Sequence, residues 1–254
     1  MRADEIENMH RLEGTYWWFV ARRRLVRLLA GKYWRRKRAA RDEESDDISI
    51  ADIGCGTGAT LTELSPMGRG AGVDISDVAL RLCAENGISD LVRAPAEALP
   101  LREGQLDLVL CLDVLEHIDD AAAARELYRI CRPGGHLIVT APAYGWLWSE
   151  HDDALGHLRR YSARELRHVL DEAGFRIVKM THALSVLLLP IALFRLLQRL
   201  RKRPDDAPKT ALIELPGPVN RLLVWVLALE MHLAAAVSLP FGVSIACVAQ
   251  RPEP

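Results

Sequence analysis

A glycine-rich turn after an apolar strand constrains the fold of this chain more than any other feature. Residues 52–58 read Asp-Ile-Gly-Cys-Gly-Thr-Gly and overlap the end of an apolar run over residues 48–53. Glycine has no Cβ, so the backbone can turn sharply here and a ligand can approach the main chain. A helix is expected to begin at Gly58, which predicts an α/β domain with a ligand at a helix N-terminus.

The spacing of the glycines separates two kinds of nucleotide ligand. Dinucleotide-binding turns prefer G-x-G-x-x-G, whereas here the third glycine comes one residue earlier. The carboxylate of Asp52 would repel a pyrophosphate and attract a positively charged group. Asp74 ends the next expected strand, 20 residues after Gly54, where a carboxylate can bind both ribose hydroxyls. The pattern favours a cationic nucleoside, although Asp74 could instead cap a helix.

Apolar runs alternate with helical patterns, which predicts a parallel sheet covered by helices. The expected strands are residues 48–53, 70–75, 91–94, 106–112, 136–140, 175–181 and 243–250. The expected helices of the core are residues 58–64, 76–86, 121–131 and 162–172. Ser162 and Glu165 have the spacing of a capping box, and residues 132–135 are expected to stop a helix and form a turn.

Several motifs in a fixed order carry a resemblance to a known family. Residues 105–117 read Gln-Leu-Asp-Leu-Val-Leu-Cys-Leu-Asp-Val-Leu-Glu-His, and residues 132–135 read Arg-Pro-Gly-Gly. With the turn and Asp74, they resemble the class I S-adenosylmethionine (SAM)-dependent methyltransferases over about residues 48–175. The resemblance implies an α/β, Rossmann-like three-layer sandwich with a seven-stranded, mostly parallel sheet whose last strand is antiparallel. We also expect an N-terminal helical lid and a hydrophobic helical insertion before the last strand.

The resemblance further implies that SAM is the cofactor. The residues expected to bind it are Asp52, Gly54, Cys55, Gly56, Gly58, Asp74, Ile75, Ala96, Glu97, Leu112 and Asp113. The chain departs from the family pattern after the third expected strand, where an acidic residue is common and residues 93–96 read Arg-Ala-Pro-Ala. Ala96 or Glu97 is therefore the expected contact to adenine.

Catalysis of methyl transfer can depend largely on orientation, and a hydroxyl acceptor would also use a base. Histidine suits this role because its unperturbed pKa is about 6.5. The candidates are His117, His151 and His157. Contacts to the acceptor are expected from Tyr144, Trp148, Arg159, Arg160 and Tyr161. The alternatives are a helix-orienting role for His117 and surface ion pairs for the two arginines.

A metal site is the other interpretation of one motif. Asp113, Glu116 and His117 resemble the Glu-x-x-Glu-His magnesium site of some methyltransferases. Asp replaces the first Glu, and a helix cap explains the same residues, so we expect no metal.

The composition fits one catalytic domain with added helices. The 254 residues are 50% hydrophobic and 26% charged, which argues against global disorder. We expect a helical lid over residues 1–47, a SAM-binding core over 48–182, an insertion over 183–240, and the last strand and tail over 241–254. The five cysteines are scattered without CxxC spacing, and the N-terminus lacks a signal-peptide pattern, so a reducing, cytoplasmic location is expected.

The expected insertion is unusually apolar. Residues 184–194 carry no charge and precede Arg195, Arg199, Arg201, Lys202 and Arg203. This stretch is shorter than the roughly 20 residues that span a bilayer. A helical pair lying in the membrane interface is one interpretation, and a helical cap or dimer surface is the other. The aromatic residues 16–19, beside several arginines, could be a second membrane contact or could cover the cofactor cleft.

We therefore expect a SAM-dependent enzyme that methylates an oxygen of a small or lipid-linked acceptor, either a glycan lipid or, second, an isoprenoid quinone. Residues 16–19 and 144–161 resemble bacterial methyltransferases associated with glycan and lipid modification. The enzyme would act in the cytoplasm or peripherally at the inner face of the membrane. The alternatives are a SAM-binding, membrane-associated interaction protein without turnover, and an RNA or DNA methyltransferase, which would show steep salt dependence.

Overall fold

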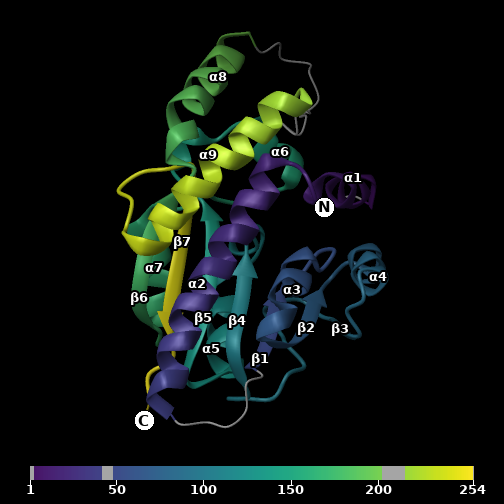
Figure 1. The fold of residues 1–254 in the computed structure, drawn as a ribbon, viewed down its shortest axis with the longest axis vertical. Coiled ribbons are helices and arrows are strands. Elements are labelled where there is room, and N and C mark those ends of the chain that lie inside the picture. The colour runs from purple at the N-terminus through teal and green to yellow at the C-terminus, as the bar shows by residue number, and fades with distance from the viewer. Residues whose placement is uncertain (1–2, 42–47, 202–214, 254) are drawn as a thin grey trace.

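One sheet organises the computed structural model, which describes residues 3–41, 48–201 and 215–253 (Figure 1). The strands are β1 (Ile48–Ile53), β2 (Gly68–Asp74), β3 (Asp90–Arg93), β4 (Leu106–Leu112), β5 (Cys131–Pro142), β6 (Arg176–Ala183) and β7 (Ser244–Gln250). Their order in the sheet is β3-β2-β1-β4-β5-β7-β6. β7 runs antiparallel to β5 and β6, and the other neighbouring strands are parallel. The predicted seven-stranded sheet with an antiparallel last strand is confirmed.

Helices cover both faces of this sheet. They are α1 (Ala3–Glu13), α2 (Trp17–Arg41), α3 (Ala59–Leu64), α4 (Asp77–Glu85), α5 (Asp120–Ile130), α6 (Glu150–Leu155), α7 (Ala163–Glu172), α8 (Leu188–Arg201) and α9 (Gly217–Ala236). Single 3-10 turns occupy Ser65–Met67, Leu115–His117, Gly145–Leu147 and Ser185–Leu187. The capping box of Ser162 and Glu165 begins α7 as predicted.

The strands could be located in the sequence because both faces of the sheet are buried. In β4, Leu108 and Leu110 pack in the same cluster as residues of α2, α3 and α9. Val109 and Cys111 point the other way and pack with residues of α5 and α7. Strands buried on both faces are nearly continuous apolar runs. The five cysteines are buried and none forms a disulfide.

Residues 132–135 follow the end of α5, as predicted for a helix stop. The irregular backbone expected here lies inside β5 and not before it, because Cys131 already pairs with Leu106 and His136 with Leu108, which leaves residues 132–135 opposite Asp107 alone. The C-terminal tail satisfies the irregular backbone here, because the Gly134 N–H donates to the Arg251 carbonyl at 2.7 Å. The local pattern of proline and glycine did not reveal this partner, which lies far away in the sequence.

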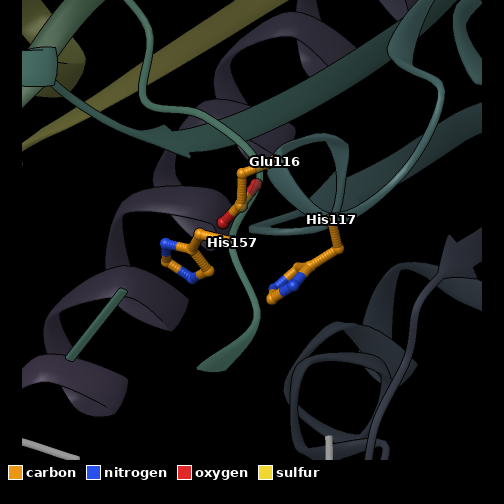
Figure 2. A group of neighbouring side chains, drawn as sticks. All are labelled: Glu116, His117 and His157. Atoms are coloured by element: carbon orange, nitrogen blue, oxygen red, sulfur yellow. The ribbon is translucent and has the colours of Figure 1, made fainter. Parts of the chain in front are cut away.

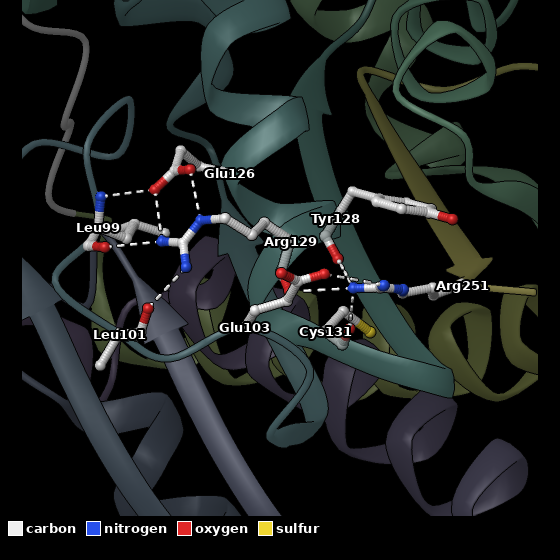
Figure 3. A network of polar contacts seen from close by, with 8 residues as sticks. All are labelled: Leu99, Leu101, Glu103, Glu126, Tyr128, Arg129, Cys131 and Arg251. Atoms are coloured by element: carbon white, nitrogen blue, oxygen red, sulfur yellow. Dashed lines mark hydrogen bonds and ion pairs between the residues drawn. The ribbon is translucent and has the colours of Figure 1, made fainter.

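Arg251 also ties the tail to the end of α5 (Figure 3). Its Nη1 donates to the carbonyls of Tyr128, Arg129 and Cys131 at 3.0, 3.0 and 3.1 Å. A cation at a helix C-terminus satisfies carbonyls that have no partner within the helix. The neighbouring Arg129 binds Glu126 and the carbonyls of Leu99 and Leu101. These contacts stabilise the sheet at the end opposite the candidate site.

The N-terminal helices and the insertion meet near the carboxyl ends of the parallel strands. In Figure 1, α2 and α9 run side by side across one face of the sheet, and α8 stands above the strand ends. The predicted lid and insertion before the last strand are therefore present. Residues 42–47 of the lid and 202–214 of the insertion, including Lys202 and Arg203, lie outside the described residues.

Candidate active site

The turn after β1 brings the main chain to the edge of a cavity. Gly54, Gly56 and Gly58 adopt positive φ angles of 75°, 53° and 79°, which glycine tolerates best. A Cβ at Gly54 would lie 2.3 Å from a methyl carbon of Val114, whereas a Cβ at Gly56 would meet nothing within 4 Å. Gly54 therefore allows close packing, and Gly56 leaves open space where a ligand can approach the backbone.

Asp74, at the end of β2, is fixed against this turn. Its carboxylate accepts hydrogen bonds from the Gly56 N–H at 2.9 Å and the Ser76 N–H at 2.8 Å. Each carboxylate oxygen has a further lone pair that could accept from a ligand. Ser76, and not Asp74, caps α4. The alternative role of Asp74 as the helix cap is thus taken by another residue.

Asp52 is buried at the end of β1, with 2% of its surface exposed. Burial raises the pKa of Asp52 to about 7. The nearby positive charge of Arg22 lowers this pKa, and the negative charge of Asp74 raises it further. Its Oδ1 has no hydrogen-bond partner. A buried oxygen without a partner is costly, so it is suited to a ligand that brings a donor or a positive charge.

A cavity of about 660 Å³ extends from the glycine turn to the histidines. The predicted cofactor residues that line it are Gly54, Cys55, Gly56, Asp74, Ile75, Ala96, Glu97, Leu112 and Asp113. Asp52 and Gly58 do not line it. A Cβ at Gly58 would lie 2.4 Å from the sulfur of Cys83, so this glycine permits packing of α4.

Helices α1 and α2 cover the cavity. Arg22 on α2 donates to a carboxylate oxygen of Asp113 at 2.7 Å, and its guanidinium lies 4.7 Å from the centre of the Trp18 ring. Glu13, at the end of α1, accepts a hydrogen bond from the Thr57 hydroxyl in the glycine turn. The sequence analysis missed Arg22 and Glu13 as site residues, because no local pattern indicates a contact across 91 or 44 residues.

Glu116, His117 and His157 converge on the same cavity (Figure 2). The ring centres of His117 and His157 are 4.7 Å apart, in an edge-to-face arrangement. Burial, with His157 as a second cause, lowers the pKa of His117 to about 4, so its ring is neutral near pH 7. Burial and the neighbouring Asp113 raise the pKa of Glu116 well above its usual value. Glu116 was named from the sequence only as a metal ligand.

Asp152 orients His157. Its Oδ1 lies 2.9 Å from Nδ1 of His157 and 2.7 Å from Nε of Arg160, and its Oδ2 accepts from the Ser149 N–H at 2.8 Å. Burial alone would raise the pKa of Asp152, but the hydrogen bond from His157 and the charge of Arg160 hold it well below its usual range. An ionised Asp152 requires Nδ1 of His157 to carry the proton, which leaves Nε2 as an acceptor.

Of the predicted acceptor contacts, one lines the cavity and the others lie outside it, where Tyr161 is buried and the rest are partly exposed. Arg160 lines the cavity, as does the predicted base His151, whose pKa burial lowers to about 4. The residues that do not line it are Tyr144, Trp148, Arg159 and Tyr161. The Tyr161 hydroxyl and Arg159 both bind Asp120, at 2.7 and 2.8 Å. These interactions hold the loop together, and a direct role toward an acceptor stays a prediction.

The three residues that resemble a magnesium site in the sequence are not arranged together as a set in the structure. Asp113 is paired with Arg22. Glu116 and His117 instead have His157 as a neighbour, and possible ligand atoms of these three residues lie within 4.8 Å of one another. The expectation of no metal stays a prediction.

Comparisons with known proteins agree with this geometry. A family model described as "Methyltransferase domain" matches residues 51–139. The ubiquinone biosynthesis O-methyltransferase of Cupriavidus pinatubonensis is 35% identical over 99 residues, which are 36% of this chain and 40% of that protein. The match therefore spans about two fifths of the relative's length.

Solved structures show the same fold. A chain of the complex between the Haloferax volcanii Trm112 methyltransferase activator and a methyltransferase matches with a TM-score of 0.60 and 17% identity, over 99% of this chain and 95% of that one. The [4+2]-cyclase SpnF matches with a TM-score of 0.58 and 22% identity, over 94% of this chain and 88% of that one. Since the second carries the name of a cyclase, the fold alone does not identify a reaction.

Proposed function

We propose that the chain, whose residues 51–139 match the methyltransferase family model, is a class I SAM-dependent methyltransferase that transfers a methyl group from SAM to an oxygen of a small or lipid-linked acceptor. The single observation that carries this proposal is the continuous cavity. It joins the glycine turn and Asp74 to the group formed by Glu116, His117 and His157. A cofactor at one end and an acceptor at the other would share one space.

The residues at the first end fit SAM. Asp74 would accept hydrogen bonds from the ribose hydroxyls. The open space at Gly56 would admit the cofactor to the main chain. Asp52 does not line the cavity, so in its ionised form it would attract the positive charge of the cofactor from behind the turn and without direct contact. Ala96 and Leu112 would provide apolar walls for the adenine. When bound, SAM supplies an electrophilic methyl group on a sulfonium.

We assign the role of general base to His157. Asp152 holds the Nδ1 proton, so Nε2 can take the proton of an acceptor hydroxyl. Such a base contributes about 10²–10⁴-fold to a rate. His117 and His151, being neutral, would not repel a cationic cofactor. They would help to position the hydroxyl, with Arg160 available for a negatively charged group beside it.

The nature of the acceptor follows from the wall of the cavity and from the relatives. Ile118, Leu155, Ile191 and Phe194 make the wall near the histidines apolar. The relative from Cupriavidus pinatubonensis is named for O-methylation in ubiquinone biosynthesis, which favours an isoprenoid quinone type of acceptor over the glycan lipid. We place the reaction in the cytoplasm or at the inner face of the membrane.

Transfer of label from methyl-labelled SAM to a cell extract tests the proposal. We expect the purified protein to label a compound that partitions into organic solvent, and His157→Gln to slow the labelling. His168→Gln, at an exposed position on α7, is the matched control and should behave as the wild type. Binding of SAM without label in any fraction would instead indicate an interaction protein. Label in RNA or DNA would indicate a nucleic-acid methyltransferase.

A further inference from the structure

One face of α9 is a stripe of exposed apolar side chains. Val219, Leu222, Trp225, Leu229 and Leu233 follow one another at intervals of three or four residues and are 45–62% exposed. This spacing places them on one side of the helix. The opposite side, which includes Leu227, Met231 and Ala234, is buried with residues of α2. Among the described residues, packing within the protein therefore uses one of the two apolar faces of α9.

Helix α8 extends this apolar surface. Leu189, Leu193 and Leu196 are 79%, 58% and 54% exposed. The turn before α8 is joined to α9 by Glu230, whose carboxylate accepts from the N–H groups of Ser185 and Val186. In Figure 1, α8 stands above the strand ends and α9 passes from that level along α2 over one face of the sheet, and we refer to α8 and α9 together as the hairpin. Exposed apolar patches of this kind mark an interaction site.

The charge of the hairpin selects the partner. In its described parts, residues 185–201 and 215–239, the one carboxylate is Glu230, which is buried. The exposed charge on α9 is that of Arg221. Over residues 185–239 as a whole, the sequence has seven lysines and arginines against four acidic residues, and Asp205, Asp206 and Glu214 fall in the segment that the structure does not describe. An apolar face with a net positive charge complements an anionic lipid surface.

The apolar surface is continuous with the active-site cavity. Phe194 lines the cavity and is also 41% exposed on α8. Ile191, one turn earlier, lines it as well. A hydrocarbon chain could therefore pass from outside the molecule to the histidines along one apolar wall.

We propose that the α8–α9 hairpin docks on an anionic lipid bilayer and that the chain of the acceptor enters the cavity beside Phe194. Docking depends on the hairpin alone, whereas the entry route rests on the proposed methyl transfer. α9 is the one helix among the described residues that is long and apolar enough to span a membrane, and 33% of its most apolar window is buried. Because α9 packs along α2, it lies on the bilayer surface in this account.

Flotation with vesicles tests the docking surface. The full-length protein should float with vesicles of phosphatidylcholine and phosphatidylglycerol, and more weakly with phosphatidylcholine alone. The double variant Leu222→Glu/Leu229→Glu should bind the vesicles at least about tenfold more weakly than the wild type, because it removes apolar area from the interface. Val178→Glu, at an exposed apolar position on β6, is the control and should float as the wild type. Equal flotation of the double variant and the wild type would overturn the proposal.

Fluorescence gives a measurement that needs no charged variant. Brominated lipids should quench the wild-type protein, and Trp225→Phe should remove most of the quenching, because Trp225 is 62% exposed on the proposed face. Unchanged quenching in Trp225→Phe would contradict docking through α9. A stable dimer in the absence of vesicles, broken by the double variant, would assign the face to a second copy of the chain.

The two proposals can fail separately. SAM affinity, measured by calorimetry on the same variants, should not depend on the hairpin. A wild type that floats but labels no compound would retain the docking surface and remove the methyl transfer. If the wild type labels a lipid in detergent but never floats with vesicles, the methyl transfer would be retained and the docking surface would be removed.

Discussion

Nδ1 of His157 lies 2.9 Å from the carboxylate of Asp152, a buried residue that does not itself line the active-site cavity. Asp152 is therefore a positioning residue, and its effect on catalysis must pass through the cavity residues it contacts, which are His157, Arg160 and Arg195. The arrangement makes the proton acceptor of the proposed reaction depend on a residue outside the cavity.

Asp152→Asn should lower kcat about 10²-fold or more, because His157 loses the partner that fixes its tautomer. The affinity for SAM should stay near that of the wild type. Steady-state kinetics and calorimetry on one preparation separate the two effects. Asp153→Asn is the matched control, since the neighbouring Asp153 is exposed and binds Trp148. A wild-type kcat in Asp152→Asn, across the pH range, would remove His157 from the role of base.

Gly56→Ala should weaken SAM binding about tenfold or more, because the new methyl group points into the space reserved for the cofactor. Gly87→Ala is a close control. Both glycines have positive φ, 53° and 87°, and a Cβ at either meets nothing within 4 Å. Each substitution should cost about 1–2 kcal/mol of stability from backbone strain. Thermal unfolding should report similar losses, and calorimetry should report weaker binding in Gly56→Ala alone. Equal affinities would place the cofactor elsewhere.

The contribution of His117 and His151 to stability should decrease as the pH falls from about 6.5 to about 4. Asp52 and Glu116, whose pKa values are raised, act in the opposite direction, so the prediction concerns the difference between each histidine variant and the wild type. Burial lowers the pKa values of His117 and His151 to about 4. In this window the unfolded chain binds protons that the folded protein excludes, so protonation favours unfolding. His117→Gln and His151→Gln should each reduce the pH dependence, while His168→Gln should not. Urea unfolding at pH 7 and pH 5 measures the difference. The same pH dependence in all four proteins would show that these rings are not held neutral.

Chelation should leave the turnover of the enzyme unchanged. The carboxylate of Asp113 is paired with Arg22, and the raised pKa of Glu116 favours its protonated form, which is a poor ligand. Activity is measured after dialysis against a chelator, with and without added magnesium. If chelation abolishes the activity and added magnesium restores it, Glu116, His117 and His157 would be metal ligands, and His157 would not be the general base.

The elements near the glycine turn could be predicted because their signals are local. The apolar runs located the strands, and the spacing of Ser162 and Glu165 located the start of α7. The places of Asp52 and Asp74 near the ends of their strands were also predicted, whereas their roles toward SAM stay predictions. Backbone conformation and residue type decide such features within a few residues of sequence.

Contacts between distant segments could not be predicted in this way. The pairing of Arg22 with Asp113 and of Glu13 with Thr57 depends on how α1 and α2 pack over the sheet. Asp152 is an intermediate case. Ser149 and Asp152 form a capping box at the start of α6, and their spacing in the sequence could have indicated which acid turns inward.

Titration of the purified protein with SAM in a calorimeter tests the central claim most directly, since the proposed methyl transfer depends on the cofactor site. The account predicts that the wild type binds SAM saturably. Asp74→Ala should bind SAM about 10–100-fold more weakly, because the ribose hydroxyls lose their hydrogen bonds to the charged carboxylate. Asp77→Ala is the control. It removes an exposed carboxylate at the start of α4 that pairs with Arg93 of β3, and this variant should bind SAM as the wild type does. No heat from the wild type, or the same affinity in Asp74→Ala, would contradict the account.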